Sequence, residues 1–184
     1  KTTNYSGVIC KTADAGYKVI VLLAGISNDL RRQTQERINE AFIGKNTTSL
    51  VGGGDTTIIG AAKHVQGAKH PYYFTTLEKD FNINQAGGAQ GIDFTNLNEP
   101  IIFVCKKNKS ILTMLNNYFS NYSKNGKIDV PLLLIDDEAD NASINTSKKP
   151  DETTTINRLI RDVLGKFNKS SYIGYTATPF ANIF

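Results

Sequence analysis

Four carboxylates stand within five consecutive positions directly behind an apolar run in the last third of the chain. Residues 132–135 read Leu-Leu-Leu-Ile, and Asp136, Asp137, Glu138 and Asp140 follow. Such a run is typical of a strand buried on both faces, and open α/β sheets bind ligands at the carboxyl ends of their strands. Nucleotide hydrolysis needs one carboxylate for hydrated Mg²⁺ and another that orients or deprotonates the attacking water. We assign the metal to Asp137 and the water to Glu138, as a catalytic pair; the alternative is a solvated acidic turn.

The first three residues, Lys1, Thr2 and Thr3, match the end of a phosphate-binding loop of the form G-x-x-x-x-G-K-[ST]. In such loops the lysine reaches the β- and γ-phosphates, and the hydroxyl residue ligates Mg²⁺. The match predicts ATP and Mg²⁺ as ligands, with all three residues at the nucleotide and Thr2 also at the metal. The alternative is an arbitrary lysine. The glycines of the loop and a strand before them are not in the sequence, so we expect a fragment of a larger ATPase.

Two threonines follow the last apolar segment of the chain. Thr176 and Thr178 lie in the sequence Thr-Ala-Thr-Pro, directly after residues 171–175. In a parallel sheet their hydroxyls would emerge at the same edge as the acidic segment. There they could bind the acidic loop and couple nucleotide state to a neighbouring domain. The alternative is a strand that simply ends at a proline.

Basic side chains follow two other strand-like segments. Arg31 and Arg32 come a few positions after a buried run and a glycine, and Lys106 and Lys107 directly follow the run at 101–105. Such cations, with the free amides at a helix start, hold nucleic-acid phosphates without reading sequence. We therefore expect DNA as a partner, with sequence-independent contacts at these four residues. The alternative is solvated helix faces.

The elements that must position these residues alternate between strands and helices. Apolar runs typical of strands lie at 18–24, 101–105, 130–135 and 171–175. Helical patterns lie at 5–13, from a cap at Asn28 or Asp29 onward with Leu30 and Ile38 inside, from a cap at Ser110 onward, and at 156–167. This alternation predicts an α/β fold with a mostly parallel, doubly wound sheet. Residues 44–100 break the pattern, and we expect an irregular insertion with short strands, such as 71–76.

Length and composition fit one such domain over residues 1–184. Hydrophobic residues make up 40% and charged residues 21%, which excludes a disordered tail and a coiled coil. No apolar run approaches the roughly 18–20 residues of a membrane span, and no signal peptide opens the chain, so we expect no membrane partner. Cys10 and Cys105 lack metal-ligand spacing, which favours a reducing cytoplasm. The net charge of +4 permits a nucleic-acid partner.

Together these segments resemble the first RecA-like domain of a superfamily 2 helicase, a P-loop ATPase. Lys1 and Thr2 are similar to the end of motif I, residues 24–33 to motif Ia, residues 137–140 to the DEAD box, and residues 176–178 to motif III. The resemblance implies ATP hydrolysis in a cleft against a second RecA-like domain of the same protein, coupled to translocation on DNA. Because that second domain would supply the arginine finger, we expect the isolated 184 residues to be inactive as an ATPase.

Three longer segments, residues 1–38, 132–145 and 154–184, resemble more closely the Z-one domain family, which carries an endonuclease label. This resemblance implies a bacterial restriction or defence protein. The sequence has no Asp-x-Lys or Glu-x-Lys pair and no zinc-ligand spacing around His64 and His70, so we expect no nuclease centre in this segment. A P-loop nucleotide switch and a degenerate scaffold domain, both without translocation, are the alternatives to a DNA motor.

Overall fold

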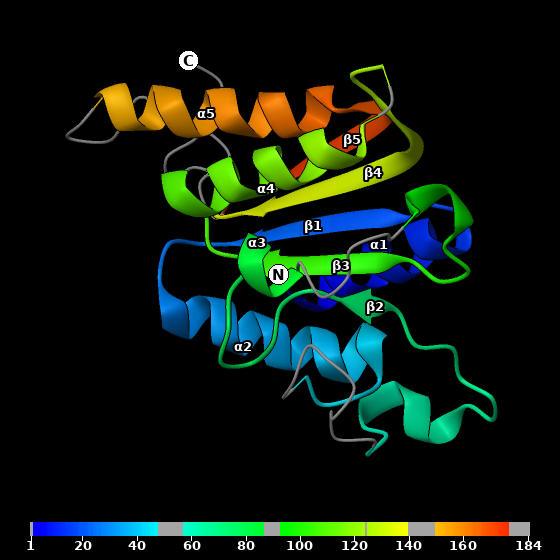
Figure 1. The fold of residues 1–184 in the computed structure, drawn as a ribbon. Helices are drawn as coiled ribbons and strands as arrows, with labels where there is room; N and C mark the ends of the chain where they lie inside the picture. Colours follow the sequence, from blue (N-terminus) through cyan, green and yellow to red (C-terminus); the bar gives the residue numbers. More distant parts are fainter. Residues whose placement is uncertain (1, 48–56, 87–92, 124, 140–149, 177–184) are drawn as a thin grey trace.

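The computed structural model of the chain describes residues 2–47, 57–86, 93–123, 125–139 and 150–176 (Figure 1). At its centre is a five-stranded sheet, in the order β2-β3-β1-β4-β5, in which every pairing is parallel. The strands are β1 (Val19–Ala24), β2 (Tyr72–Tyr73), β3 (Ile101–Cys105), β4 (Ile128–Asp137) and β5 (Phe167–Tyr175). The predicted α/β fold with a parallel sheet is therefore confirmed.

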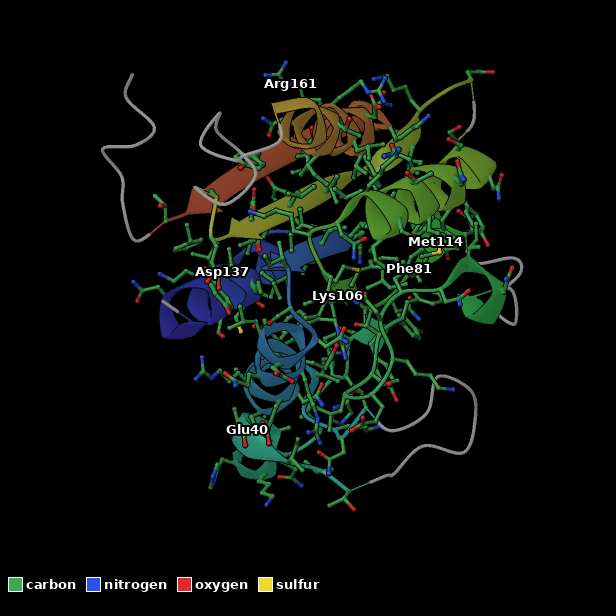
Figure 2. The ribbon with its side chains drawn as sticks, turned by 90° about the vertical axis from the view of Figure 1, so that its left-hand side faces the viewer. Glu40, Phe81, Lys106, Met114, Asp137 and Arg161 are labelled. Atoms are coloured by element: carbon green, nitrogen blue, oxygen red, sulfur yellow. The ribbon has the colours of Figure 1, made fainter. Side chains whose placement is uncertain are left out.

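Helices cover both faces of this sheet, as Figures 1 and 2 show. On one face lie α1 (Thr2–Asp14) and α2 (Asn28–Ile38), and on the other lie α4 (Lys109–Tyr122) and α5 (Pro150–Gly165). α2 continues directly into a short π-helix, η1 (Asn39–Ile43). Among the described residues, no helix is both long enough and apolar enough to cross a membrane.

A hydrophobic core lies on each face of the sheet, and successive residues of a central strand alternate between the two cores. In β4, Ile135 packs in the core under α1 and α2, whereas Leu134 packs in the core under α4 and α5. Because successive side chains of a strand point to opposite faces, the last two residues of β4 also separate. Asp136 projects towards α4 and α5, and Asp137 projects towards α1 and α2. The fold thus gives two adjacent acids different surroundings.

Both predicted helix caps are wrong by one or two positions. Before α2 the Ser27 side chain, rather than Asn28 or Asp29, accepts a hydrogen bond from the Leu30 amide at 3.1 Å. Before α4 the side chain of Asn108, rather than of Ser110, accepts from the Ile111 amide at 2.9 Å. Several capping residues stand in a row at each start, so residue type alone does not select among them.

The last strand is longer than predicted. β5 begins at Phe167, which was expected to close the preceding helix, whereas α5 ends at Gly165. Residues 168–170 of β5 are exposed, because β5 is paired on one side only among the described residues. Polar residues are compatible with such an exposed position. A search for a continuous apolar run therefore misses this part of the strand.

The region 44–100 is irregular, as expected, but it is anchored in the core. It contains η2 (Gly60–His64), β2, α3 (Ile83–Ala86) and η4 (Phe94–Asn96), while residues 48–56 and 87–92 lie outside the described residues. The strand expected at 71–76 is reduced to the two residues of β2. Phe74 and Phe81 pack their rings against Phe103 of β3, each with centroids 5.4 Å apart. The insertion therefore completes the core on the α4 side of the sheet.

Candidate functional site

The acidic segment forms a tight turn where β4 ends. Asp137 Oδ1 accepts a hydrogen bond from the Glu138 amide at 3.0 Å, and the Ala139 amide donates to the Tyr175 carbonyl of β5 at 2.9 Å. Between these bonds Glu138 has a left-handed backbone with φ of 59°. For a residue other than glycine such a conformation costs about 1–3 kcal/mol, and it persists only where neighbouring contacts enforce it. The turn therefore fixes the backbone from which the Glu138 side chain projects.

Asp137 lies at the same edge of the sheet as the start of α1. In the sheet it is level with Ala24 of β1 and Tyr175 of β5. The ring of Tyr175 contacts that of Tyr5 in α1, with centroids 5.7 Å apart, so the first turns of α1 reach this edge. Figure 2 looks onto the carboxyl ends of the strands and labels Asp137 close to α1. The amides and partial positive charge of a helix N-terminus suit a phosphate group.

The residues predicted to bind phosphate are described only in part. Lys1 and the side chains of Thr2 and Thr3 lie outside the described part of the chain, whereas the backbone of Thr2 and Thr3 opens α1. The helix start is therefore placed, but the roles of these three residues at ATP and Mg²⁺ stay predictions.

Glu138 lies against the end of the neighbouring strand β1. Gly25 follows β1 with φ of 73°, and a Cβ added there would lie 3.1 Å from Glu138 Oε2. Because Gly25 has no side chain, the Glu138 carboxylate approaches the backbone between the ends of β1 and β4. This contact makes Gly25 part of the site, whereas its place in the sequence indicates only a glycine after a strand.

The acidic turn fits a magnesium ion that is held mainly by a substrate. Within the described ranges, no group of three or more His, Cys, Asp or Glu side chains could share a metal. Mg²⁺ at nucleotide sites uses one or two carboxylates together with substrate phosphates and water, so a full protein cage is not required. The half-exposed Asp137 offers such a carboxylate on the face where α1 begins. Asp140 lies outside the described residues.

The prediction that Lys107 contacts nucleic acid is wrong. Its side chain is 0% exposed, and Nζ lies 2.7 Å from Asp136 Oδ1, which is also 0% exposed. The same nitrogen donates to the Glu138 carbonyl oxygen at 2.6 Å. Lys107 reaches these groups across the end of β1, where its own amide donates to the Gly25 carbonyl at 2.7 Å. Its charge is used inside the protein and does not face a nucleic acid.

The prediction for Arg31 is wrong for a similar reason. Only 3% of this residue is exposed, and its guanidinium donates to the backbone carbonyls of Thr76 and Leu77 at 2.8 and 2.6 Å. Arg31 therefore ties α2 to the insertion. Leu30, which was expected on the inner side of α2, is instead exposed.

Arg32 and Lys106 retain the accessibility that a phosphate contact requires. Arg32 is exposed and forms a 3.2 Å ion pair with Glu78, which is also exposed. Lys106 is partly exposed at the carboxyl end of β3 and is labelled in Figure 2. Of the four predicted nucleic-acid contacts, these two remain candidates, and they lie beside the same edge as Asp137.

Next to Lys106 lies a half-buried carboxyl, Asp80. It accepts hydrogen bonds from the amides of Phe81 at 2.7 Å and Lys106 at 3.1 Å. Burial raises the pKa of Asp80, and these amides together with the charges of Arg31 and Lys106 partly oppose that rise. Burial, followed by the charge of Asp80, also raises the pKa of the Cys105 thiol well above its usual value. Cys105 is therefore a protonated core residue rather than a nucleophile.

The predicted coupling threonines are only partly placed. Thr176 directly follows Tyr175 at the end of β5, beside the acidic turn, whereas Thr178 lies beyond the described residues. Their role in coupling stays a prediction.

Comparisons of the chain with protein-family models, with curated proteins and with solved structures each found no match.

Proposed function

We propose that this chain is the ATP-binding and hydrolysing domain of a superfamily 2 helicase-like DNA translocase. In this proposal it is the first of two RecA-like P-loop domains in a bacterial restriction or defence protein, acting in the cytoplasm. The proposal depends on one observation above all. The Asp137–Glu138 turn and the first turns of α1 meet at the carboxyl edge of a parallel sheet, on the same face.

The chemistry assigned to each residue follows from this placement. The amides at the start of α1 would bind the phosphates of the nucleotide, assisted by Lys1. Mg²⁺, held by Asp137 and Thr2, would neutralise charge on those phosphates. Glu138, whose backbone is restrained and whose carboxylate lies against Gly25, would accept a proton from the attacking water or orient it.

Magnesium-dependent nucleotide binding tests this proposal in the full-length protein. We expect Asp137→Asn to reduce ATP affinity in the presence of Mg²⁺ to the level of the wild-type protein in EDTA, since the metal then lacks its carboxylate. Titration with a fluorescent ATP analogue, with and without Mg²⁺, measures both values. No nucleotide binding by the wild-type protein would favour a scaffold domain, and binding without DNA-stimulated hydrolysis would favour a nucleotide switch.

Arg32 and Lys106 give a second test, directed at the DNA partner. Changing both to alanine should weaken DNA binding equally for every sequence. The slope of log affinity against log salt should flatten by up to about 0.9 for each duplex phosphate that the protein no longer neutralises. Fluorescence anisotropy at several salt concentrations measures the slope. Lys63→Ala with Lys69→Ala removes the same charge from exposed positions of the insertion and serves as the control. Equal slopes in both double variants would exclude Arg32 and Lys106 as specific contacts.

A further inference from the structure

Lys107 connects two parts of the acidic turn through one buried nitrogen. Nζ donates to Asp136 Oδ1 at 2.7 Å and to the Glu138 carbonyl oxygen at 2.6 Å. The other oxygen of Asp136 accepts a hydrogen bond from the Tyr172 hydroxyl at 3.1 Å. The ammonium therefore bridges a buried residue of β4 and a backbone oxygen two positions further along the chain.

The buried pair has little to contribute through stability alone. Moving two charges out of water costs about as much free energy as their attraction returns, and apolar pairs often replace such ions without loss. Asp136 also cannot act beside Asp137, because alternation directs it to the opposite face of β4, among side chains under α4 and α5. Its surroundings, Lys107 and Tyr172, suit a counterion better than a metal ligand or a base.

The second bond of Lys107 acts on the strained residue of the turn. Glu138 has a left-handed backbone, and its carbonyl is the one that Lys107 holds. The amide of Lys107 is bonded to the carbonyl of Gly25, the same residue that the Glu138 carboxylate approaches. Lys107 thus holds the Glu138 backbone through its ammonium group. Through its amide it also holds Gly25, against which the Glu138 carboxylate lies.

We infer that Lys107 is a positioning residue: paired with Asp136, it holds the Glu138 carbonyl and so aims the Glu138 carboxylate. This inference rests on the proposed function, because the aim matters only if Glu138 acts on water. Asp136 neutralises the ammonium so that it can be buried, and the Tyr172 hydroxyl bonds only the Asp136 oxygen that Lys107 does not use. None of these three residues touches the substrate.

The variant that tests this role removes the charges together. Lys107→Met with Asp136→Asn leaves no unpaired buried charge and roughly keeps both side-chain lengths. In the full-length protein we expect unchanged ATP affinity and a kcat lower by about 10- to 100-fold, as misplacement of a reacting group by about 1 Å can cause. Hydrogen exchange at the Ala139 amide should be faster by about tenfold or more, because the turn opens locally.

Tyr172→Phe is the matched control, since it removes a bond to Asp136 but leaves the bond from Lys107 to Glu138. It should keep kcat and the exchange rate of Ala139 close to wild type. Unchanged kcat and exchange in the double variant would overturn the positioning role. If the wild-type protein does not hydrolyse ATP, the proposed function fails, and the exchange rate alone decides whether Lys107 holds the turn.

A second measurement needs no variant and applies even if the double variant does not fold. In the wild-type protein, the ammonium protons of Lys107 should exchange slowly enough with water to give a resolved proton–nitrogen signal. That signal should show scalar coupling to the carbonyl carbon of Glu138. A lysine signal in rapid exchange, without this coupling, would contradict the inference directly.

Discussion

Replacing Glu138 by glutamine is expected to lower ATP turnover in the full-length protein by about 10²- to 10⁴-fold, the usual contribution of a general base. Glutamine keeps the size of the side chain and its place against Gly25, but it cannot take a proton from water. Nucleotide affinity should not change, because in the proposed function Asp137 and the start of α1 bind the nucleotide. Single-turnover hydrolysis together with equilibrium nucleotide binding separates the two effects.

Asp129→Asn provides the control, since it removes one carboxylate from the other end of the same strand. Asp129 accepts a hydrogen bond from Asn168 at 2.9 Å, and it lies far along β4 from the acidic turn. This variant should hydrolyse ATP at the wild-type rate. Hydrolysis by Glu138→Gln near the wild-type rate would remove Glu138 from the mechanism, whatever the nucleotide affinity.

The central strands were predictable because their burial is visible in the sequence. β1 and β3 are covered on both faces by helices, so every residue in them is apolar and buried. β5 was located only in its second half, since its exposed residues 168–170 are polar. The strand order was not predictable, and without it no pattern shows that Lys107 after β3 reaches Asp136 on β4 across the end of β1.

Residue type and order predicted the acidic turn, with Asp137 at the metal and Glu138 at the water, whereas the separation of Asp136 from Asp137 came from geometry. Counting along the sequence does not say where β4 ends, and a shift of one residue exchanges the faces of Asp136 and Asp137. The register with β5 places Asp137 beside Tyr175 and leaves Asp136 beside Gly174. Gly174 has no side chain, and a Cβ there would lie 3.4 Å from the Tyr172 hydroxyl. The glycine therefore leaves room beside Asp136 for the hydroxyl that donates to it.

The buried face of α2 could not be recognised by hydrophobicity, because most of its residues, including Arg31, are polar. The buried side of α2 consists of Arg31, Thr34, Gln35 and Ile38, which follow the i, i+3, i+4, i+7 spacing of an inner face. Only one of these residues is apolar, so the hydrophobic pattern placed Leu30 inside instead. Two of the polar members have partners in the insertion: Arg31 donates to the carbonyls of Thr76 and Leu77, and Gln35 Oε1 accepts from the Thr75 hydroxyl at 2.7 Å.

Replacing Arg31 by methionine should therefore destabilise the fold rather than weaken DNA binding specifically. The change removes two hydrogen bonds from a charged donor, each worth about 1.5–3 kcal/mol, so we expect a loss of about 3–6 kcal/mol in the free energy of unfolding. Arg32→Met is the matched control. Its ion pair with Glu78 is exposed on both sides, and such pairs contribute only about 0.2–1 kcal/mol. Urea unfolding followed by circular dichroism measures both changes.

The loss caused by Arg31→Met should also depend on pH, through Asp80. Burial raises the pKa of Asp80 above its ordinary 3.8, and the charge of Arg31 partly opposes that rise. A carboxyl whose pKa is higher in the folded state binds its proton more tightly there, so its ionisation destabilises the fold as pH rises. Without Arg31 the folded pKa rises further. The difference in unfolding free energy between wild type and Arg31→Met should thus be smallest near the ordinary pKa and increase towards neutral pH.

An equal difference at every pH would show that Arg31 does not act on Asp80. A loss of DNA affinity with unchanged stability would return Arg31 to the nucleic-acid interface.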